Sequence, residues 1–126
     1  MKSVMQRCFT NILTEEVAAT AAFYQDLLGL QPQFVSDWFV NLADADNPAL
    51  ELGILKQTSE IVPARAQRAT AGVILTFVVD DCSTVYERAL TLGVNVVEAP
   101  REMPYGQMRM IVRDPAGTFV DISSPV

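Results

Sequence analysis

The sequence predicts an α+β protein of two βαβββ modules, whose curled mixed sheets surround a cup and carry one helix on each outer face. Three observations predict this fold. The chain has two helical segments, and they end in LLG and TLG motifs that lie 64 residues apart. One strand-like run precedes each helix and three follow it. A polar segment without periodicity, residues 57–70, separates the two halves. A repeat of this kind sets the architecture.

The first half begins with a strand at residues 7–13 and continues into a helix at residues 14–30. Thr14 can cap this helix, and the two glutamates that follow it suit the positive end of the helix dipole. Gly29 ends the helix. The residues expected to form its buried stripe are Val17, Ala21, Tyr24 and Leu28. The remaining strands are expected at residues 30–36, 38–43 and 49–56.

The second half repeats this plan. A strand at residues 72–80 leads into a helix at residues 82–92, with Asp80 or Asp81 as its cap and Gly93 at its end. Its expected buried stripe is Cys82, Val85, Ala89 and Leu92. The last three strands are expected at residues 94–99, 107–113 and 118–123, with an Asp-Pro-x-Gly turn before the final one.

The composition limits the class of protein. A chain of 126 residues, half of them hydrophobic, is expected to fold as a single domain, residues 1–126. Its first module would span about residues 5–56, the connector residues 57–70, and the second module about residues 71–126. No apolar run approaches the ~20 residues of a membrane span, and no signal-peptide stretch opens the chain, so we expect a cytoplasmic protein without a membrane partner. The net charge of −6 disfavours nucleic acid and mildly favours cationic ligands.

Several motifs resemble the vicinal oxygen chelate superfamily. They are FY and LLGL in the first half, and ILTFVVDD, YERALTLGV and APREMPYGQMRMIVRDPAGTFVDIS in the second. This superfamily includes glyoxalase I, extradiol dioxygenases, fosfomycin-resistance transferases and bleomycin-resistance binding proteins. The resemblance covers nearly the whole chain. It implies the cup-shaped fold and a homodimer in which the second chain completes or covers the cup.

The resemblance also implies where a metal would bind. Enzymes of the superfamily usually hold a divalent metal with His or Gln on the first strand of each half and Glu on the last. Here the first-strand positions are Phe9 and Ile74, and the last-strand positions are Glu51 and Asp121. The chain has no histidine. Zinc, nickel and iron(II) sites need nitrogen or sulfur donors, so we expect no metal and no cofactor, and metal-dependent glyoxalase I activity is disfavoured.

Alternation along the strands points every second side chain into the cup. Nine residues are expected to contact a ligand, among them Tyr105, whose loop the resemblance implies borders the pocket: Phe9, Asn11, Trp38, Phe39, Glu51, Ile74, Thr76, Tyr105 and Asp121. An apolar cavity with a few polar groups is typical of a small-molecule site. Two carboxylates close together would raise the pKa of one of them, and the pair would anchor an amine or act as a general base.

Simpler interpretations stand beside these. Glu51 would pair with Arg109 or Arg113, and Asp121 would be solvated. Trp38 and Phe39 would belong to the core, and Tyr105 would be an ordinary loop aromatic.

The leading functional hypothesis is a small-molecule binding protein that lacks the usual metal site. It would resemble the bleomycin-resistance branch, with an antibiotic-resistance role and a cationic aromatic antibiotic as the ligand. The alternative is a lyase, isomerase or dioxygenase-like enzyme. It would use Glu51 and Asp121 as acid and base, or as ligands of an oxygen-rich magnesium or calcium site with Asn11, Thr76 and waters.

Overall fold

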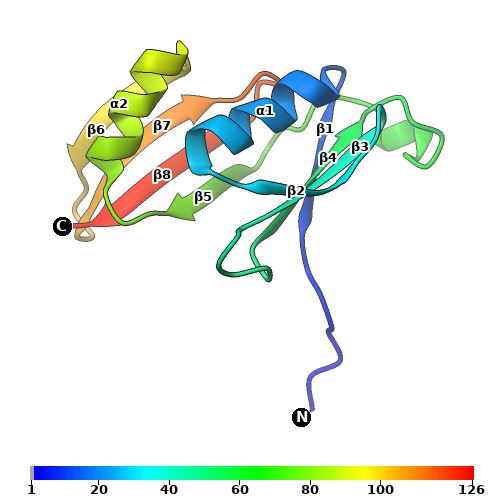
Figure 1. The fold of residues 1–126 in the computed structure, drawn as a ribbon, viewed down its shortest axis with the longest axis horizontal. Helices are drawn as coiled ribbons and strands as arrows, with labels where there is room; N and C mark the ends of the chain where they lie inside the picture. The colour runs from blue at the N-terminus through cyan, green and yellow to red at the C-terminus, as the bar shows by residue number, and fades with distance from the viewer. Residues whose placement is uncertain (1) are drawn as a thin grey trace.

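The computed structural model describes residues 2–126 as two four-stranded sheets with two helices on one side (Figure 1). The elements of the first half are β1 (Thr10–Thr14), α1 (Val17–Leu28), β2 (Gln31–Val35), β3 (Phe39–Ala43) and β4 (Glu51–Lys56). Those of the second half are β5 (Ile74–Val78), α2 (Cys82–Leu92), β6 (Asn95–Glu102), β7 (Gln107–Arg113) and β8 (Phe119–Pro125). A single 3-10 turn, Ala64–Ala66, lies between the halves.

The two sheets have the same topology. Their strand orders are β1-β4-β3-β2 and β5-β8-β7-β6. In each sheet the strand that comes first along the chain pairs in parallel with the one that comes last, β1 with β4 and β5 with β8. The other neighbouring strands are antiparallel. The sheets are therefore mixed and do not close into a barrel. This confirms the predicted α+β fold with two βαβββ modules.

Glycines and one aspartate set the helix limits largely as expected. Gly29 and Gly93 end the helices with φ values of 73° and 71°, a left-handed conformation that glycine adopts at little cost. The side chain of Asp81 accepts a 3.1 Å hydrogen bond from the Ser83 amide and caps α2. The predicted cap of α1 is wrong. Helix α1 begins at Val17 and Glu16 stands at its N-cap.

The buried stripes differ from the prediction at one residue in each helix. In α1 it is Leu27, fully buried, that joins Tyr24 in the core, whereas Leu28 is only half-buried. In α2 the predicted stripe holds except for Leu92, which is 45% exposed at the last helical residue. The periodicity located each helix correctly but not the residue at which its C-terminal turn leaves the core.

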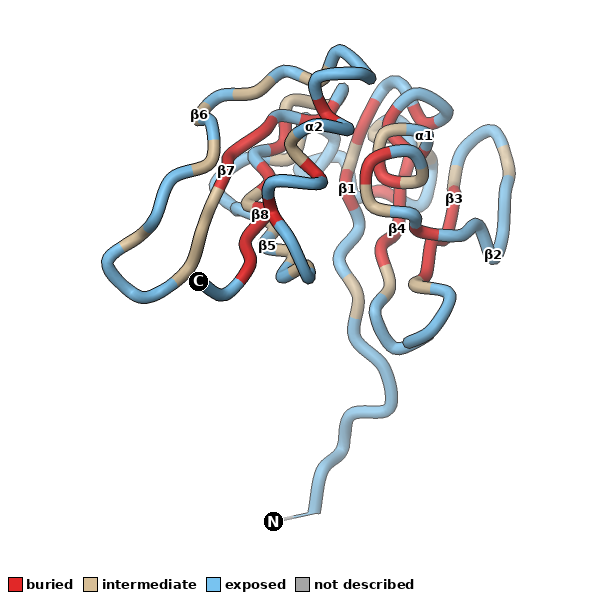
Figure 2. Tube along the Cα trace, turned by 60° about the vertical axis from the view of Figure 1, so that its left-hand side comes forward, coloured by how far each residue is buried: buried red, intermediate tan, exposed pale blue. Residues whose placement is uncertain are grey.

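Buried contacts from the helices tie the halves together. The Tyr24 hydroxyl on α1 donates a 2.6 Å hydrogen bond to Asp114 in the β7–β8 turn, and its ring lies 6.0 Å from that of Phe77 on β5. Arg88 on α2 donates to the Leu27 carbonyl oxygen at 2.8 Å. Figure 2 shows the buried residues gathered between the helices and the sheets.

The sheet faces turned away from the helices are the inner faces. In the second sheet, Ile74, Val78 and Phe119 on this face are 62%, 67% and 41% exposed. Residues 2–9 precede β1 without regular secondary structure, and the start of this segment extends away from the body of the molecule (Figure 2). Within residues 2–126, no helix has the length and apolar character needed to cross a membrane.

Candidate functional site

A cavity of about 510 Å³ opens where the two sheets approach each other. The starts of β1 and β4 form one wall, β5 forms the other, and the end of α1 lies beside them. Most of the lining is apolar. The lining residues are Cys8, Phe9, Thr10, Leu28, Leu30, Asp44, Ala49, Leu50, Glu51, Leu52 and residues 76–79. The volume lies within the ~300–1,000 Å³ common for small-molecule sites.

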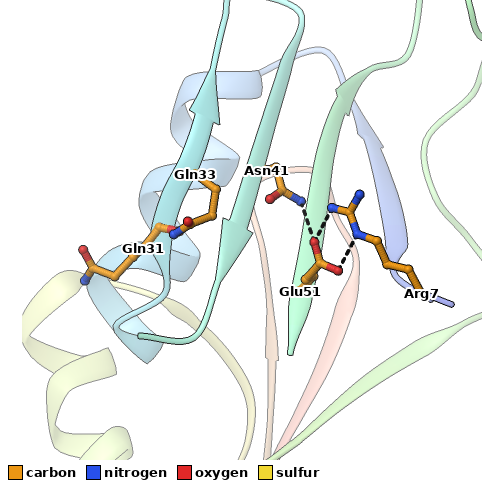
Figure 3. Close-up of polar contacts among 5 residues, drawn as sticks. All are labelled: Arg7, Gln31, Gln33, Asn41 and Glu51. Carbon is orange, nitrogen blue, oxygen red and sulfur yellow. Dashed lines mark hydrogen bonds and ion pairs between the residues drawn. The ribbon is translucent and has the colours of Figure 1, made fainter. Parts of the chain in front are cut away.

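Glu51 is one of the polar residues that line this cavity, and other side chains of the protein donate hydrogen bonds to both of its carboxylate oxygens. Arg7 donates from Nε to Oε2 at 2.7 Å and from Nη2 to Oε1. The Asn41 amide on β3 also donates to Oε1, at 3.4 Å. Figure 3 shows Arg7 and Asn41 on either side of the Glu51 carboxylate, with Gln31 and Gln33 beyond Asn41. Only 10% of the Glu51 side chain is exposed.

These contacts keep Glu51 ionised. The hydrogen bonds from Arg7 hold the pKa of the Glu51 carboxyl below its usual value, against the opposing effect of desolvation, and the Asn41 amide acts in the same direction as Arg7. The expectation that a second carboxylate would raise the pKa of one of the two acids is therefore not met at Glu51, whose pKa is lowered. The expected partners were also wrong: Arg109 pairs with Glu98 at 3.0 Å, and Arg113 donates to the Gly117 carbonyl oxygen.

Asp121 is held separately, by hydroxyl groups of the second sheet. Its Oδ1 accepts a 2.5 Å hydrogen bond from Ser123, and its Oδ2 accepts one from Thr76 at 3.3 Å. Asp121 and Thr76 are directly paired in the β5–β8 register, which places their side chains on the same inner face. The carboxylate remains half exposed. Asp121 is therefore hydrogen-bonded rather than merely solvated.

The four positions implied for a metal do not fit one. Phe9 and Ile74 have no donor atoms, and both oxygens of Glu51 already accept hydrogen bonds from Arg7 and Asn41. In the described part of the chain, residues 2–126, no three His, Cys, Asp or Glu side chains are placed to hold a metal ion. The charge that a divalent ion would contribute beside Glu51 is contributed by the guanidinium of Arg7.

The structure divides the nine predicted ligand residues into two groups. Phe9, Glu51 and Thr76 line the cavity. The other six lie outside its lining: Asn11, Trp38, Phe39, Ile74, Tyr105 and Asp121.

Among these six, the aromatic residues of the first sheet form a group on its inner face. Trp38 precedes β3 instead of lying on a strand, is 39% exposed, and has its ring 5.8 Å from that of Phe39. The ring of Phe34 lies 6.1 Å from that of Phe39 and extends the group. These aromatic side chains are partly exposed on the sheet surface and do not belong to the core. Tyr105 is 62% exposed in the loop between β6 and β7.

Arg7 is the site residue that the sequence did not reveal. The predicted strand at residues 7–13 included Arg7, but β1 begins at Thr10, and alternation along one strand cannot identify a partner 44 residues away. Its guanidinium carbon lies 4.6 Å from the centre of the Phe9 ring. The arginine two residues before an inner aromatic was the available signal, since a guanidinium readily stacks on such a ring.

The two cysteines differ in their surroundings. Cys8 is exposed and lines the cavity. Cys82 is fully buried, its Sγ–H donates to the Ile122 carbonyl oxygen at 3.3 Å, and burial raises the pKa of its thiol. Its place at the start of α2 therefore does not make it a reactive thiolate.

Comparisons with known proteins agree with this fold. The family model for the Glyoxalase/Bleomycin resistance protein/Dioxygenase superfamily matches residues 7–122. No curated protein matches the chain. Among solved structures, a glyoxalase/bleomycin resistance protein/dioxygenase family enzyme from Burkholderia phytofirmans PsJN is 25% identical with a TM-score of 0.77, over 94% of this chain and 97% of that one.

Two further structures are similar. Virulence protein STM3117 from Salmonella typhimurium is 25% identical with a TM-score of 0.75, over 98% of this chain and 100% of that one. A lactoylglutathione lyase from Agrobacterium tumefaciens is 21% identical with a TM-score of 0.72, over 98% of this chain and 96% of that one, and it shares the fold. Because the family model spans nearly the whole sequence and the paired βαβββ units agree with it, the chain belongs to the Glyoxalase/Bleomycin resistance protein/Dioxygenase superfamily.

Proposed function

We propose that this protein binds a small organic molecule, without a metal, in the cavity between its two sheets. The observation that carries the proposal is the pairing of Glu51 with Arg7 at the edge of a largely apolar cavity of about 510 Å³. A carboxylate that already accepts hydrogen bonds from an arginine and an asparagine is a poor ligand for a metal, whereas the apolar walls suit a hydrophobic ligand.

The same pairing weakens the case for a cationic drug. An amine attracted to Glu51 would compete with a guanidinium that already makes two charge-assisted hydrogen bonds. Bleomycin-type compounds therefore belong in the test set as one charge class among several. An antibiotic-resistance role depends on which class binds.

The test is a calorimetric titration of planar compounds that include bleomycin-type drugs and simple aromatic acids, alcohols and amines. Saturable binding of at least one class, with one site per chain, is expected. Val78→Trp should weaken that binding at least about tenfold, because Val78 lines the cavity and is 67% exposed, so a larger side chain can enter the space.

Val97→Trp is the matched control. Val97 is 45% exposed on β6 and outside the cavity lining, so this variant should bind as the wild type does. The proposal is wrong if no compound binds saturably, or if both tryptophan variants weaken binding equally.

We also propose that the protein is a homodimer in which a second chain covers the inner faces. The exposed apolar side chains Ile74, Val78 and Phe119 on the second sheet support this. Ile74 and Phe119 are paired neighbours, and the Thr76–Asp121 pair separates them from Val78. Exposed apolar side chains gathered on one sheet face commonly mark an interface.

The second candidate function is metal-independent acid–base catalysis, as in an isomerase or lyase. The hydrogen bonds of Asp121 with Ser123 and Thr76 favour it, because they fix a half-exposed carboxylate on the inner face. Glu51 is poorly suited to act as the base, because Arg7 lowers its pKa and donates hydrogen bonds to both of its carboxylate oxygens.

Exchange of carbon-bound protons for deuterium tests this candidate. It would be monitored by NMR in deuterated water for a panel of ketoacids and hydroxyketones. Asp121→Asn should abolish any exchange, with Glu98→Gln as an inner-face control. Exchange that persists undiminished in Asp121→Asn removes Asp121 from the mechanism.

A further inference from the structure

The acidic groups at the cavity are all bound by donors of the protein itself. Glu51 is held by Arg7 and Asn41. Asp44 accepts hydrogen bonds from the backbone amides of Asp46 and Asn47, at 3.1 and 2.9 Å. A cationic ligand at Glu51 would therefore have to displace hydrogen bonds that the fold already makes, whereas at Asp44 only Oδ2 accepts these hydrogen bonds.

The charged residues of the inner faces are also unlike those of the chain as a whole. The strand registers, side-chain contacts and cavity lining place four arginines and four acids on these faces and at the cavity, which gives no net charge where the chain has −6. The arginines are Arg7, Arg101, Arg109 and Arg113, and the acids are Asp44, Glu51, Glu98 and Asp121. The acidity of the sequence therefore belongs mainly to the outer surface and does not describe the side on which the cavity opens.

Arg7 is a basic group in contact with the cavity lining. It touches two lining residues, Glu51 through the ion pair and Phe9 through its ring, so it lies at the cavity edge. These two contacts fix the plane of the guanidinium. Its side chain remains 58% exposed, and its Nη1 group has no partner within residues 2–126. One edge of the guanidinium is thus used by the protein, and the other is open to a ligand.

A planar carboxylate is the group that this open edge fits. Arginine presents its donors in a rigid fork that matches two carboxylate oxygens, and a guanidinium held in place loses little entropy on binding. The adjoining walls of Phe9, Leu50, Phe77 and Val78 are apolar.

We propose that the cavity binds an apolar monocarboxylic acid, with its hydrocarbon part between the sheets and its carboxylate on the free edge of Arg7. This inference rests on the proposed function and adds the chemical class of the ligand and the residue that anchors its charge. Glu51 then acts as a positioning residue, because it orients Arg7 and does not contact the ligand.

Three probes with the same ring test the inference: naphthoate, naphthylmethanol and naphthylmethylammonium, each titrated by calorimetry. Wild-type protein should bind naphthoate roughly tenfold more tightly than the alcohol, the size of one charge-assisted hydrogen bond, and should bind the ammonium compound more weakly than either.

The decisive variant is the double substitution Arg7→Gln with Glu51→Gln. Arg7→Gln alone would leave the Glu51 carboxylate unpaired. That carboxylate would repel naphthoate even if Arg7 were not the anchor, so the single variant cannot test the inference. The double variant removes both charges, so naphthoate should lose its advantage over the alcohol while the alcohol binds as before. Arg65→Gln, an exposed arginine of the connector, is the control and should change nothing.

The outcomes separate the two proposals. If the ammonium compound or the alcohol binds as tightly as naphthoate, or if the double variant keeps the preference for naphthoate, the inference is overturned and the binding function stands. If none of the three probes binds, the inference is overturned, and the binding function is decided by the wider set of planar compounds.

Discussion

Arg7 and Glu51 form a two-point ion pair between the N-terminal segment and the first residue of β4, beside the ring of Phe9. The pair places a positive charge of the protein itself where the family resemblance implied half of a metal site. It also closes the start of the chain onto the first sheet.

This ion pair should make the free energy of unfolding depend on pH. The pKa of Glu51 is lowered in the folded protein, so its contribution is fully present above the unfolded value of about 4.5 and is lost as the pH falls through the lower folded pKa. Denaturant unfolding between about pH 7 and pH 3 should show this loss in the wild type. Glu51→Gln should show a smaller loss.

Glu60→Gln is the control for that experiment, because Glu60 is an exposed glutamate of the connector. Its acid dependence should match that of the wild type. Equal slopes in the wild type and Glu51→Gln would contradict the assigned role of the pair.

The contact between Tyr24 and Asp114 should be a main link between the halves. Both residues are buried, and Oδ2 of Asp114 accepts from the Tyr24 hydroxyl, whereas Oδ1 accepts from the amides of Ala116 and Thr118. Tyr24→Phe leaves Oδ2 without its donor and should lower the free energy of unfolding by about 1.5–3 kcal/mol.

Tyr86→Phe on α2 provides the comparison, since Tyr86 is only half-buried. Chemical denaturation should give a change within about 0.5 kcal/mol for this variant. Similar losses of unfolding free energy in both variants would mean that the hydrogen bond from Tyr24 to Asp114 is not a main link between the halves.

The proposed dimer predicts a clear effect of charge on the inner face. Ile74→Glu places a carboxylate on an apolar residue that is 62% exposed, and it should convert dimer to monomer in light scattering. Leu90→Glu changes a similarly exposed leucine on α2 and should leave the dimer intact. A monomeric wild-type protein would refute the dimer directly.

The two thiols should react at different rates. Cys8 is exposed and should be modified by a chromogenic disulfide reagent in the folded protein. Cys82 is buried and its raised pKa disfavours the thiolate, so it should react only on unfolding. Cys8→Ser should remove the fast phase, and a remaining fast phase would mean that α2 opens readily.

The sequence was sufficient for the elements whose signals are local. Asp81, Gly93 and the apolar spacing of α2 located that helix at residues 82–92, as observed. The Asp-Pro-x-Gly turn also formed, with Asp114 accepting from backbone amides and Gly117 at φ 90°. Local hydrogen bonds and glycine conformations depend on neighbours in the sequence, so they can be read from it.

The site was harder to predict because its contacts are not local. Alternation assigned Glu51 and Asp121 to the inner faces, but it could not identify their partners. Arg7 reaches Glu51 across 44 positions, and the hydroxyl of Thr76 reaches Asp121 across 45 positions. The net charge of the chain also gave no guide to the inner faces, because charge is unevenly distributed between the two sides of a sheet.

Metal content is the most direct test of the claim that Arg7, and not a metal ion, balances Glu51. Untagged protein would be measured by mass spectrometry before and after exposure to excess zinc, nickel, manganese and magnesium, followed by removal of free ions. We predict that no metal is retained in stoichiometric amount. One retained ion per chain that disappears in Glu51→Gln or Asp121→Asn would contradict the account, because it would mean that these acids bind metal in spite of the arginine.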